Sequence, residues 1–199
     1  DGDGDGSLDD YYSIAIQDIA SLAWHSSDKN STVSGGSGNN FWCADPEIEG
    51  YRDSWIQYLD TPSISIGDGG NFSAKIFYAI EDPSSASVSG SCTDGWDVAN
   101  IRISIDGGET WTLLEDSSVP YLFDCGYGWI FNDIEYDTEG SLNHLAKGWG
   151  GNSNTWQNFN ADLSDYAGQD IIIRFAFGSD PAWSTVDESA ITGFQIDEI

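Results

Sequence analysis

The chain has 199 residues, of which 34 are acidic and only 6 are Lys or Arg, so its formal net charge is −28 at pH 7. Phosphate binding needs clusters of Lys and Arg, so this charge excludes nucleic acid as a partner and disfavours anionic membrane surfaces. No apolar run approaches the roughly 20 residues of a membrane span, so we expect no membrane insertion. The carboxylates are left with two uses: ligands for divalent cations, and a solvated surface that keeps the protein soluble.

The first ten residues, DGDGDGSLDD, differ in composition from the rest of the chain. They match the start of a D-x-D-x-D-G calcium loop, in which alternate carboxylates surround one ion and Gly6 permits the tight turn. The expected ligands are Asp1, Asp3, Asp5 and Asp9. Tyr12 stands where an EF-hand has a bidentate Glu, so the pattern is closer to the single calcium repeats that link domains of secreted proteins. We expect residues 1–12 to be a calcium-loop-like linker; the alternative is an acidic linker without metal.

Alternating apolar and polar residues predict strands along much of the remaining chain. The clearest stretches are residues 55–66, 71–81, 101–105, 169–178 and 190–199. Residues 169–178 carry apolar side chains on both faces, which is typical of a centre strand. At least six strands separated by turns, with no long amphipathic helix, predict an all-β fold, a two-sheet antiparallel β-sandwich (jelly roll). We assign residues 13–199 to this one domain.

The stretch 115–155 is the least regular part of the chain and is rich in Gly, Asn, Asp and aromatic residues. A long irregular stretch in a compact domain tends to be a functional loop. Aromatic residues in such polar segments are the best candidates for ligand contacts, namely Tyr127, Trp129, Trp149 and Trp183. The alternative is that these rings cover the ends of the sandwich, because Trp is usually highly buried.

Three cysteines are present, and none lies in a C-x-x-C motif, so a zinc ribbon or thioredoxin-like site is excluded. Cys92 and Cys125 both lie in Gly-rich polar turns, and we expect them to pair across two loops of an extracellular domain. Cys43 is then a small buried residue. The sequence alone leaves other pairings open.

No catalytic signature is present, whether a zincin helix, a nucleophile elbow or a nucleotide-binding loop. Residues 104–111 match the S-x-D-x-G-x-T-W pattern of the Asp-boxes in sialidase propellers. A propeller needs several copies and a much longer chain, so we interpret this motif as a hairpin only. We expect a protein that is not an enzyme.

The order of the landmarks is more specific than any single motif. The series consists of Trp24-His25, Phe41–Pro46, Leu59–Ile64, Asp94–Asp97, Ile103–Trp111, Asp162–Gly168, Ile173–Phe175 and Gly193–Ile199. Over about residues 22–199 it resembles the non-catalytic jelly-roll domain of secreted metallopeptidases of the immune inhibitor A family, and it is similar to MAM-like and cleaved-adhesin domains. The resemblance implies a jelly roll with a structural calcium ion, used for adhesion or substrate attachment, without catalysis.

In the domains that this chain resembles, the structural ion ties the first part of the domain to its last strand. The matching groups are Asp45, Asp94, Asp97 and Asp197. Asp197 lies between Ile196 and Ile199 in a strand expected to pack on the core, and a buried carboxylate is costly unless it is paired or bound to metal. We therefore expect a Ca²⁺ ion in the sandwich, with a surface turn at Asp197 as the alternative.

Two functions remain for such a domain. The first is a calcium-stabilised adhesion or attachment module that binds an extracellular protein or glycan surface. The second is a carbohydrate-binding module of a polysaccharide-degrading enzyme, and three exposed, roughly coplanar aromatic rings along one groove would distinguish it. The chain begins at Asp1 without Met and ends in a strand-like segment, so we expect a piece of a larger secreted or cell-surface protein, whose other domains are among its partners.

Overall fold

A computed structural model of the protein describes residues 23–86, 93–126 and 147–199. Within these ranges the chain forms ten strands and two one-turn 3₁₀ helices, η1 (Pro83–Ser85) and η3 (Ser164–Tyr166). No helix among the described residues has the length and apolar character needed to cross a membrane.

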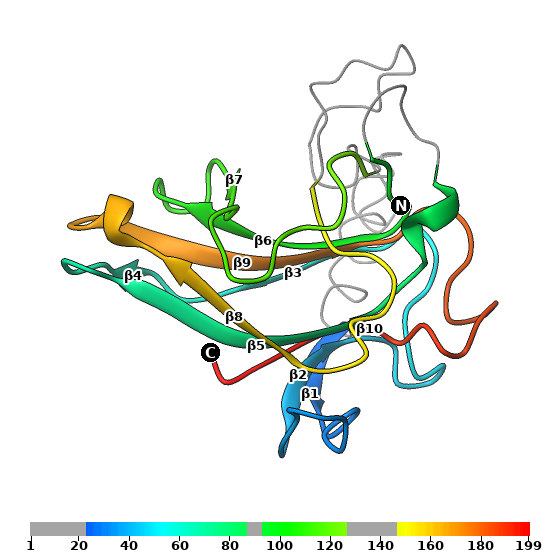
Figure 1. Ribbon diagram of the computed structural model, residues 1–199. Helices are drawn as coiled ribbons and strands as arrows, with labels where there is room; N and C mark the ends of the chain where they lie inside the picture. The colour runs from blue at the N-terminus through cyan, green and yellow to red at the C-terminus, as the bar shows by residue number, and fades with distance from the viewer. Residues whose placement is uncertain (1–22, 87–92, 127–146) are drawn as a thin grey trace, which may run out of the picture.

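The strands form two sheets of five strands each, stacked as two layers (Figure 1). The first sheet has the order β1-β2-β10-β5-β8, with β1 at Trp24–Ser27, β2 at Asn40–Cys43, β10 at Gly193–Asp197, β5 at Asn71–Ala79 and β8 at Gln157–Asp162. The second has the order β3-β9-β6-β7 with β4 also paired to β9, and contains β3 at Ile56–Asp60, β4 at Ile64–Ser65, β6 at Val98–Ser104, β7 at Thr112–Leu113 and β9 at Asp170–Gly178. All these pairings are antiparallel, and the chain crosses repeatedly from one sheet to the other. The predicted two-sheet β-sandwich is confirmed.

The core lies between the sheets and follows the period-two alternation of the long strands. On β9, the centre strand between β3 and β6, Ile171, Ile173, Phe175 and Phe177 face inward and are fully buried. Phe72, Ala74, Ile76 and Tyr78 of β5 face them from the first sheet. The outward positions of the same strands are left for polar side chains and for contacts on the outer faces.

The predicted hairpin at residues 104–111 is confirmed as the turn between β6 and β7. The carboxylate of Asp106 accepts hydrogen bonds from Ser104 Oγ, Thr110 N and Thr110 Oγ1, which holds the turn together. Trp111 leaves the turn and covers the guanidinium of Arg174, 3.7 Å from its ring centroid, on the outer face of the second sheet. The motif therefore has a structural role.

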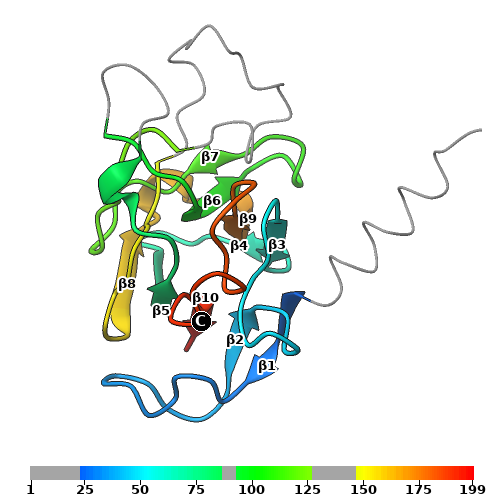
Figure 2. The ribbon, with the colours of Figure 1, turned by 90° about the vertical axis from the view of Figure 1, so that its right-hand side faces the viewer.

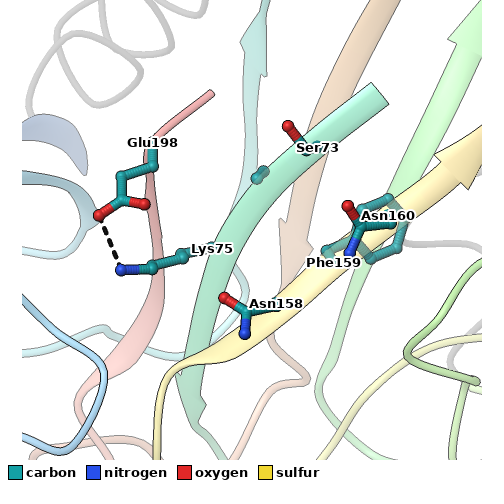
Figure 3. Close-up of a pocket in the computed structure, with 7 residues that line it drawn as sticks. Ser73, Lys75, Asn158, Phe159, Asn160 and Glu198 are labelled. Carbon is teal, nitrogen blue, oxygen red and sulfur yellow. Dashed lines mark hydrogen bonds and ion pairs between the residues drawn. The ribbon is translucent and has the colours of Figure 1, made fainter. Parts of the chain in front are cut away.

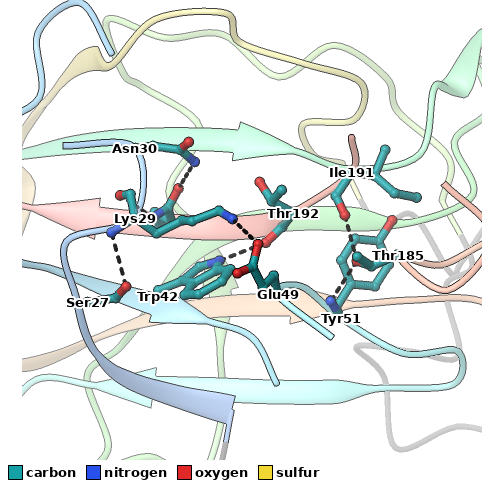
Figure 4. Close-up of polar contacts among 10 residues, drawn as sticks. Ser27, Lys29, Asn30, Trp42, Glu49, Tyr51, Thr185, Ile191 and Thr192 are labelled. Carbon is teal, nitrogen blue, oxygen red and sulfur yellow. Dashed lines mark hydrogen bonds and ion pairs between the residues drawn. The ribbon is translucent and has the colours of Figure 1, made fainter. Parts of the chain in front are cut away.

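The loop between β1 and β2 runs along the outer face of the first sheet toward β8 (Figure 2). Asn30 Nδ2 donates to Gln195 Oε1 at 2.6 Å, and Trp156 Nε1 donates to Asn30 O at 3.1 Å. Lys29 reaches Glu49 at 3.0 Å and lies 5.4 Å from the Trp42 ring centroid (Figure 4). This loop therefore covers buried Gln195 on β10 and shields part of the sheet from solvent.

Candidate metal centre

Three carboxylates meet at one end of the sandwich, and we call Glu81, Asp97 and Asp180 the carboxylate cluster. One oxygen from each lies within 4.8 Å of one from each of the others. Glu81 follows β5 of the first sheet, whereas Asp97 directly precedes β6 and Asp180 follows β9 in the second. Antiparallel pairing of Val98 with Gly178 brings the start of β6 to the end of β9. The cluster therefore combines residues from both sheets.

Tyr51 holds the cluster from the segment before β3. Its hydroxyl donates to Asp97 Oδ2 at 2.5 Å and accepts from Glu81 N at 3.1 Å. The backbone N of Tyr51 donates to Thr185 Oγ1 at 2.8 Å, and Thr185 Oγ1 donates in turn to Ile191 O (Figure 4). Asp180 N donates to Asp97 Oδ1 at 2.8 Å. The Asp97 carboxylate is thus held by a buried network, to which Glu81 and Asp180 are joined through their backbone N.

The distances suit one shared cation. Calcium binds oxygen at about 2.4 Å, so two of its ligands are separated by at most about 4.8 Å. The cluster contains only carboxylate oxygens, which hard cations such as Ca²⁺ prefer over softer metals. Glu81 Oε2 is buried and has no hydrogen-bond partner among the described residues. An ion here would be bound by Glu81, Asp97 and Asp180, with backbone carbonyls or water completing its coordination.

Within the described residues, no Lys or Arg side chain neutralises the cluster. Five of the six Lys and Arg residues of the chain form ion pairs with carboxylates elsewhere, and the sixth, Arg102 on β6, donates Nε to Asn100 Oδ1. The charged groups that shift the pKa values of the three cluster carboxylates are all acidic. A buried carboxylate without a counter-charge is costly, so the scarcity of cations leaves a divalent ion as the natural partner.

Burial raises the pKa of all three carboxyl groups in the ion-free protein. Asp97 is fully buried, and its pKa is raised well above the usual value although Tyr51 and Asp180 N donate hydrogen bonds to it. Burial, followed by the charges of Asp180, Asp53 and Asp82, raises the pKa of Glu81 to about 7. Burial therefore favours the neutral form of each carboxyl group in the ion-free protein, whereas a bound cation would favour the charged form.

We expect the ion-free protein to become more stable as the pH falls from 8 to 6. A carboxyl group whose pKa is higher in the folded state than in the unfolded chain binds its proton more tightly when folded, so protonation through the Glu81 pKa of about 7 favours folding. Urea unfolding in excess EGTA at pH 8, 7 and 6 measures this slope, and Glu81→Gln should flatten it. Equal slopes in the two proteins, or a fall in wild-type stability at pH 6, would contradict the expectation.

Of the sandwich acids expected to bind calcium, only Asp97 belongs to the cluster. Asp45 forms an ion pair with Arg52 at 2.7 Å, and the backbone of Asp94 bridges to Cys125. Asp197 is not in the core: it lies opposite Lys75 in the register of β10 and β5, and its Oδ1 accepts from Glu198 N. Since Ile196 points inward, the adjacent Asp197 points outward. The other predicted ligands, Asp1, Asp3, Asp5 and Asp9, lie outside the described residues.

The sequence interpretation missed Glu81 and Asp180. Each is an acid two residues beyond the end of one of the two longest strands, in Glu81-Asp82-Pro83 and in Asp180-Pro181. Acidic residues at strand ends that are followed by Pro could have drawn attention to both. That sequence pattern does not show which strand ends meet at one end of the sandwich.

The aromatic residues proposed as ligand contacts differ in their exposure to solvent. Trp149 is fully buried in the core, so its assignment as a ligand contact is wrong, because its ring packs between the sheets. Trp183 is 51% exposed and has a φ of 64°, an unusual conformation for a bulky residue. Tyr127 and Trp129 lie outside the described residues.

Trp183 is connected to the carboxylate cluster through its loop. Asp180 Oδ1 accepts from Ala182 N at 2.8 Å, and Thr185 N donates to Tyr51 O at 3.1 Å. The residues on both sides of Trp183 are therefore linked to Asp97 by hydrogen bonds, Ala182 through Asp180 and Thr185 through Tyr51. Unusual backbone conformations persist where the surrounding structure enforces them, and they are common at ligand sites.

The structure describes two of the three cysteines, so it tests only part of the cysteine prediction. Cys43 is a free, buried thiol, and burial raises its pKa. Cys125 is buried, and its backbone N donates to Thr93 O at 3.0 Å. Cys92, the residue before Thr93, lies outside the described residues, so the Cys92–Cys125 disulfide stays a prediction.

No protein-family model and no curated protein sequence matches the chain. The function is therefore inferred from the chemistry of the site.

Proposed function

We propose that the chain is a calcium-stabilised, non-catalytic attachment module of a larger secreted or cell-surface protein, and that it binds an extracellular protein or glycan surface. The observation that carries this proposal is the carboxylate cluster: three acids from two sheets share one site, and none has a cationic partner in the described part of the chain. A Ca²⁺ ion at this position would hold the end of β5 to the start of β6 and the end of β9. The ion is structural in this proposal.

The exposed surface next to the cluster supports an attachment role. Trp183 and Val186 are 51% and 66% exposed on the loop that follows β9. An exposed Trp with a fixed backbone offers a large contact area at low entropic cost, and Trp is enriched at binding hot spots. The proposed module would use this loop as part of its contact surface.

The burial of the Trp side chains favours an attachment module over a polysaccharide-binding module. Trp42, Trp149 and Trp156 are buried, and Trp24, Trp55, Trp96 and Trp111 are partly buried, so Trp183 is the only exposed Trp in the described residues. These residues provide no row of three exposed coplanar rings. The enzyme-linked carbohydrate-binding module therefore remains the weaker of the two hypotheses.

Calcium binding tests the proposal directly. In isothermal titration calorimetry on chelator-treated protein, we expect Asp97→Asn to weaken calcium binding at the sandwich site at least tenfold, because it removes the most buried of the three charges. Asp68→Asn is the matched control: Asp68 is exposed in the turn before β5 and forms no hydrogen bond within the described chain. No calcium binding up to millimolar concentrations, or equal binding by wild type and Asp97→Asn, would refute the metal site.

A further inference from the structure

The outer face of the first sheet contains a second site of different character, a pocket of about 280 Å³ between β5, β8 and the C-terminal end of the chain. Its lining includes Ser73, Lys75, Asn158, Asn160 and Glu198 (Figure 3). The volume lies just below the roughly 300–1,000 Å³ of sites for drug-sized ligands, so it suits one small unit of a larger molecule.

Strand register builds this pocket. In the antiparallel pairing of β5 with β8, Ser73 lies opposite Asn160 and Lys75 lies opposite Asn158. The residues between them, Ala74 and Phe159, point inward and are buried. The polar side chains therefore project from the two paired strands onto the same outer face. Side chains on regular strands are positioned more precisely than side chains on loops.

The polar groups of the pocket are open to a ligand. Among the described residues, the amides of Asn158 and Asn160 and the hydroxyl of Ser73 form no side-chain hydrogen bond to protein. Each amide offers two donors and one acceptor, and the hydroxyl offers both functions. Lys75 Nζ and Glu198 Oε1, paired at 2.7 Å, add a charged donor and a charged acceptor at one side.

This arrangement selects the chemistry of the ligand. An anionic ligand is disfavoured, since Lys75 is already neutralised by Glu198 and the chain carries a net charge of −28. An apolar ligand is disfavoured as well, because Ala74 and Phe159 are buried beneath polar side chains. The amides and the hydroxyl match a neutral molecule with closely spaced groups that both donate and accept hydrogen bonds, such as the vicinal hydroxyls of a sugar.

We infer that this pocket binds a single sugar unit of a neutral glycan through hydrogen bonds, without stacking on an aromatic platform. The inference rests on the proposed function in that it names a ligand for the attachment module, but it needs no metal. The two Asn amides of β8 bridge adjacent hydroxyls, while Ser73 and the Lys75–Glu198 pair orient the ring from β5 and the C-terminal end.

The test begins with a glycan array that carries neutral, uronic-acid-containing and sulfated oligosaccharides, probed with the wild-type chain. We expect retention of neutral glycans. The best neutral oligosaccharide is then titrated by calorimetry into wild type, the double variant Asn158→Ala/Asn160→Ala and the control Asn39→Ala. The double variant should lose at least tenfold in affinity with an unchanged melting temperature. Asn39 is exposed in the loop before β2, away from the pocket lining, so its variant should bind normally.

Retention of no neutral glycan, retention of acidic glycans only, or equal affinity of the double variant would overturn the inference. The Asp97→Asn protein distinguishes the pocket inference from the metal proposal. Because the pocket needs no metal, this variant should bind the glycan although its calcium binding is weakened. Calcium binding without glycan binding refutes the pocket alone. Glycan binding without a calcium site refutes the metal centre alone.

Discussion

Removal of calcium is expected to lower the melting temperature of the wild-type protein by about 5–10 °C. An ion that binds only the folded state stabilises it by about 2.7 kcal/mol when its free concentration is 100 times Kd. For a domain of this size, about 1 kcal/mol shifts the melting temperature by about 2–4 °C. The measurement is thermal unfolding followed by circular dichroism in excess calcium and in excess EGTA.

Asp97→Asn should behave differently in the two conditions. In EGTA the stability difference of the variant from wild type should be small, because the substitution removes a carboxyl group whose charged form burial disfavours, but leaves one amide oxygen where two carboxylate oxygens accepted from Tyr51 and Asp180 N. In calcium it should be less stable than wild type and respond little to the chelator. Asp68→Asn should retain the full calcium response. A wild-type melting temperature that is the same in both conditions would contradict a structural ion.

Trp149→Ala is expected to destabilise the fold by about 3–5 kcal/mol, the usual cost of truncating a buried large aromatic residue. The Trp149 side chain is fully buried and stacks on Tyr78, with ring centroids 6.1 Å apart. It also packs on Tyr121 at 4.7 Å, and its Nε1 donates to Pro120 O at 3.1 Å. The substitution leaves a large cavity and removes the donor to that backbone carbonyl. Urea unfolding measures the loss.

Trp183→Ala is the matched control for this substitution. Its side chain is half exposed, so we expect a change in the free energy of unfolding of less than about 1 kcal/mol. Trp149→Ala should affect ligand binding only through loss of folded protein, whereas Trp183→Ala should affect binding with little change in stability. Similar losses of stability in the two variants would show that the Trp183 loop is part of the core packing.

Local sequence patterns were enough to predict the main strands and the class of the fold. The alternation in residues 71–81 and 169–178 corresponds to β5 and β9, and inward-facing residues of both strands form the core. Such patterns are sufficient because burying one face of a strand requires apolar residues at every second position. The excess of acids over cations also showed, without a structure, that few carboxylates have a protein counter-charge.

The grouping of residues into a site became visible only in three dimensions. Glu81, Asp97 and Asp180 are far apart in sequence, and they meet because the ends of β5, β6 and β9 lie at the same end of two stacked sheets. The same packing buried Trp149, although it lies in a Gly-rich irregular segment, and left Asp197 on the outer face, although it lies between Ile196 and Ile199. Local sequence sets which face of a strand is apolar, but the pairing of distant strands depends on contacts that no local pattern contains.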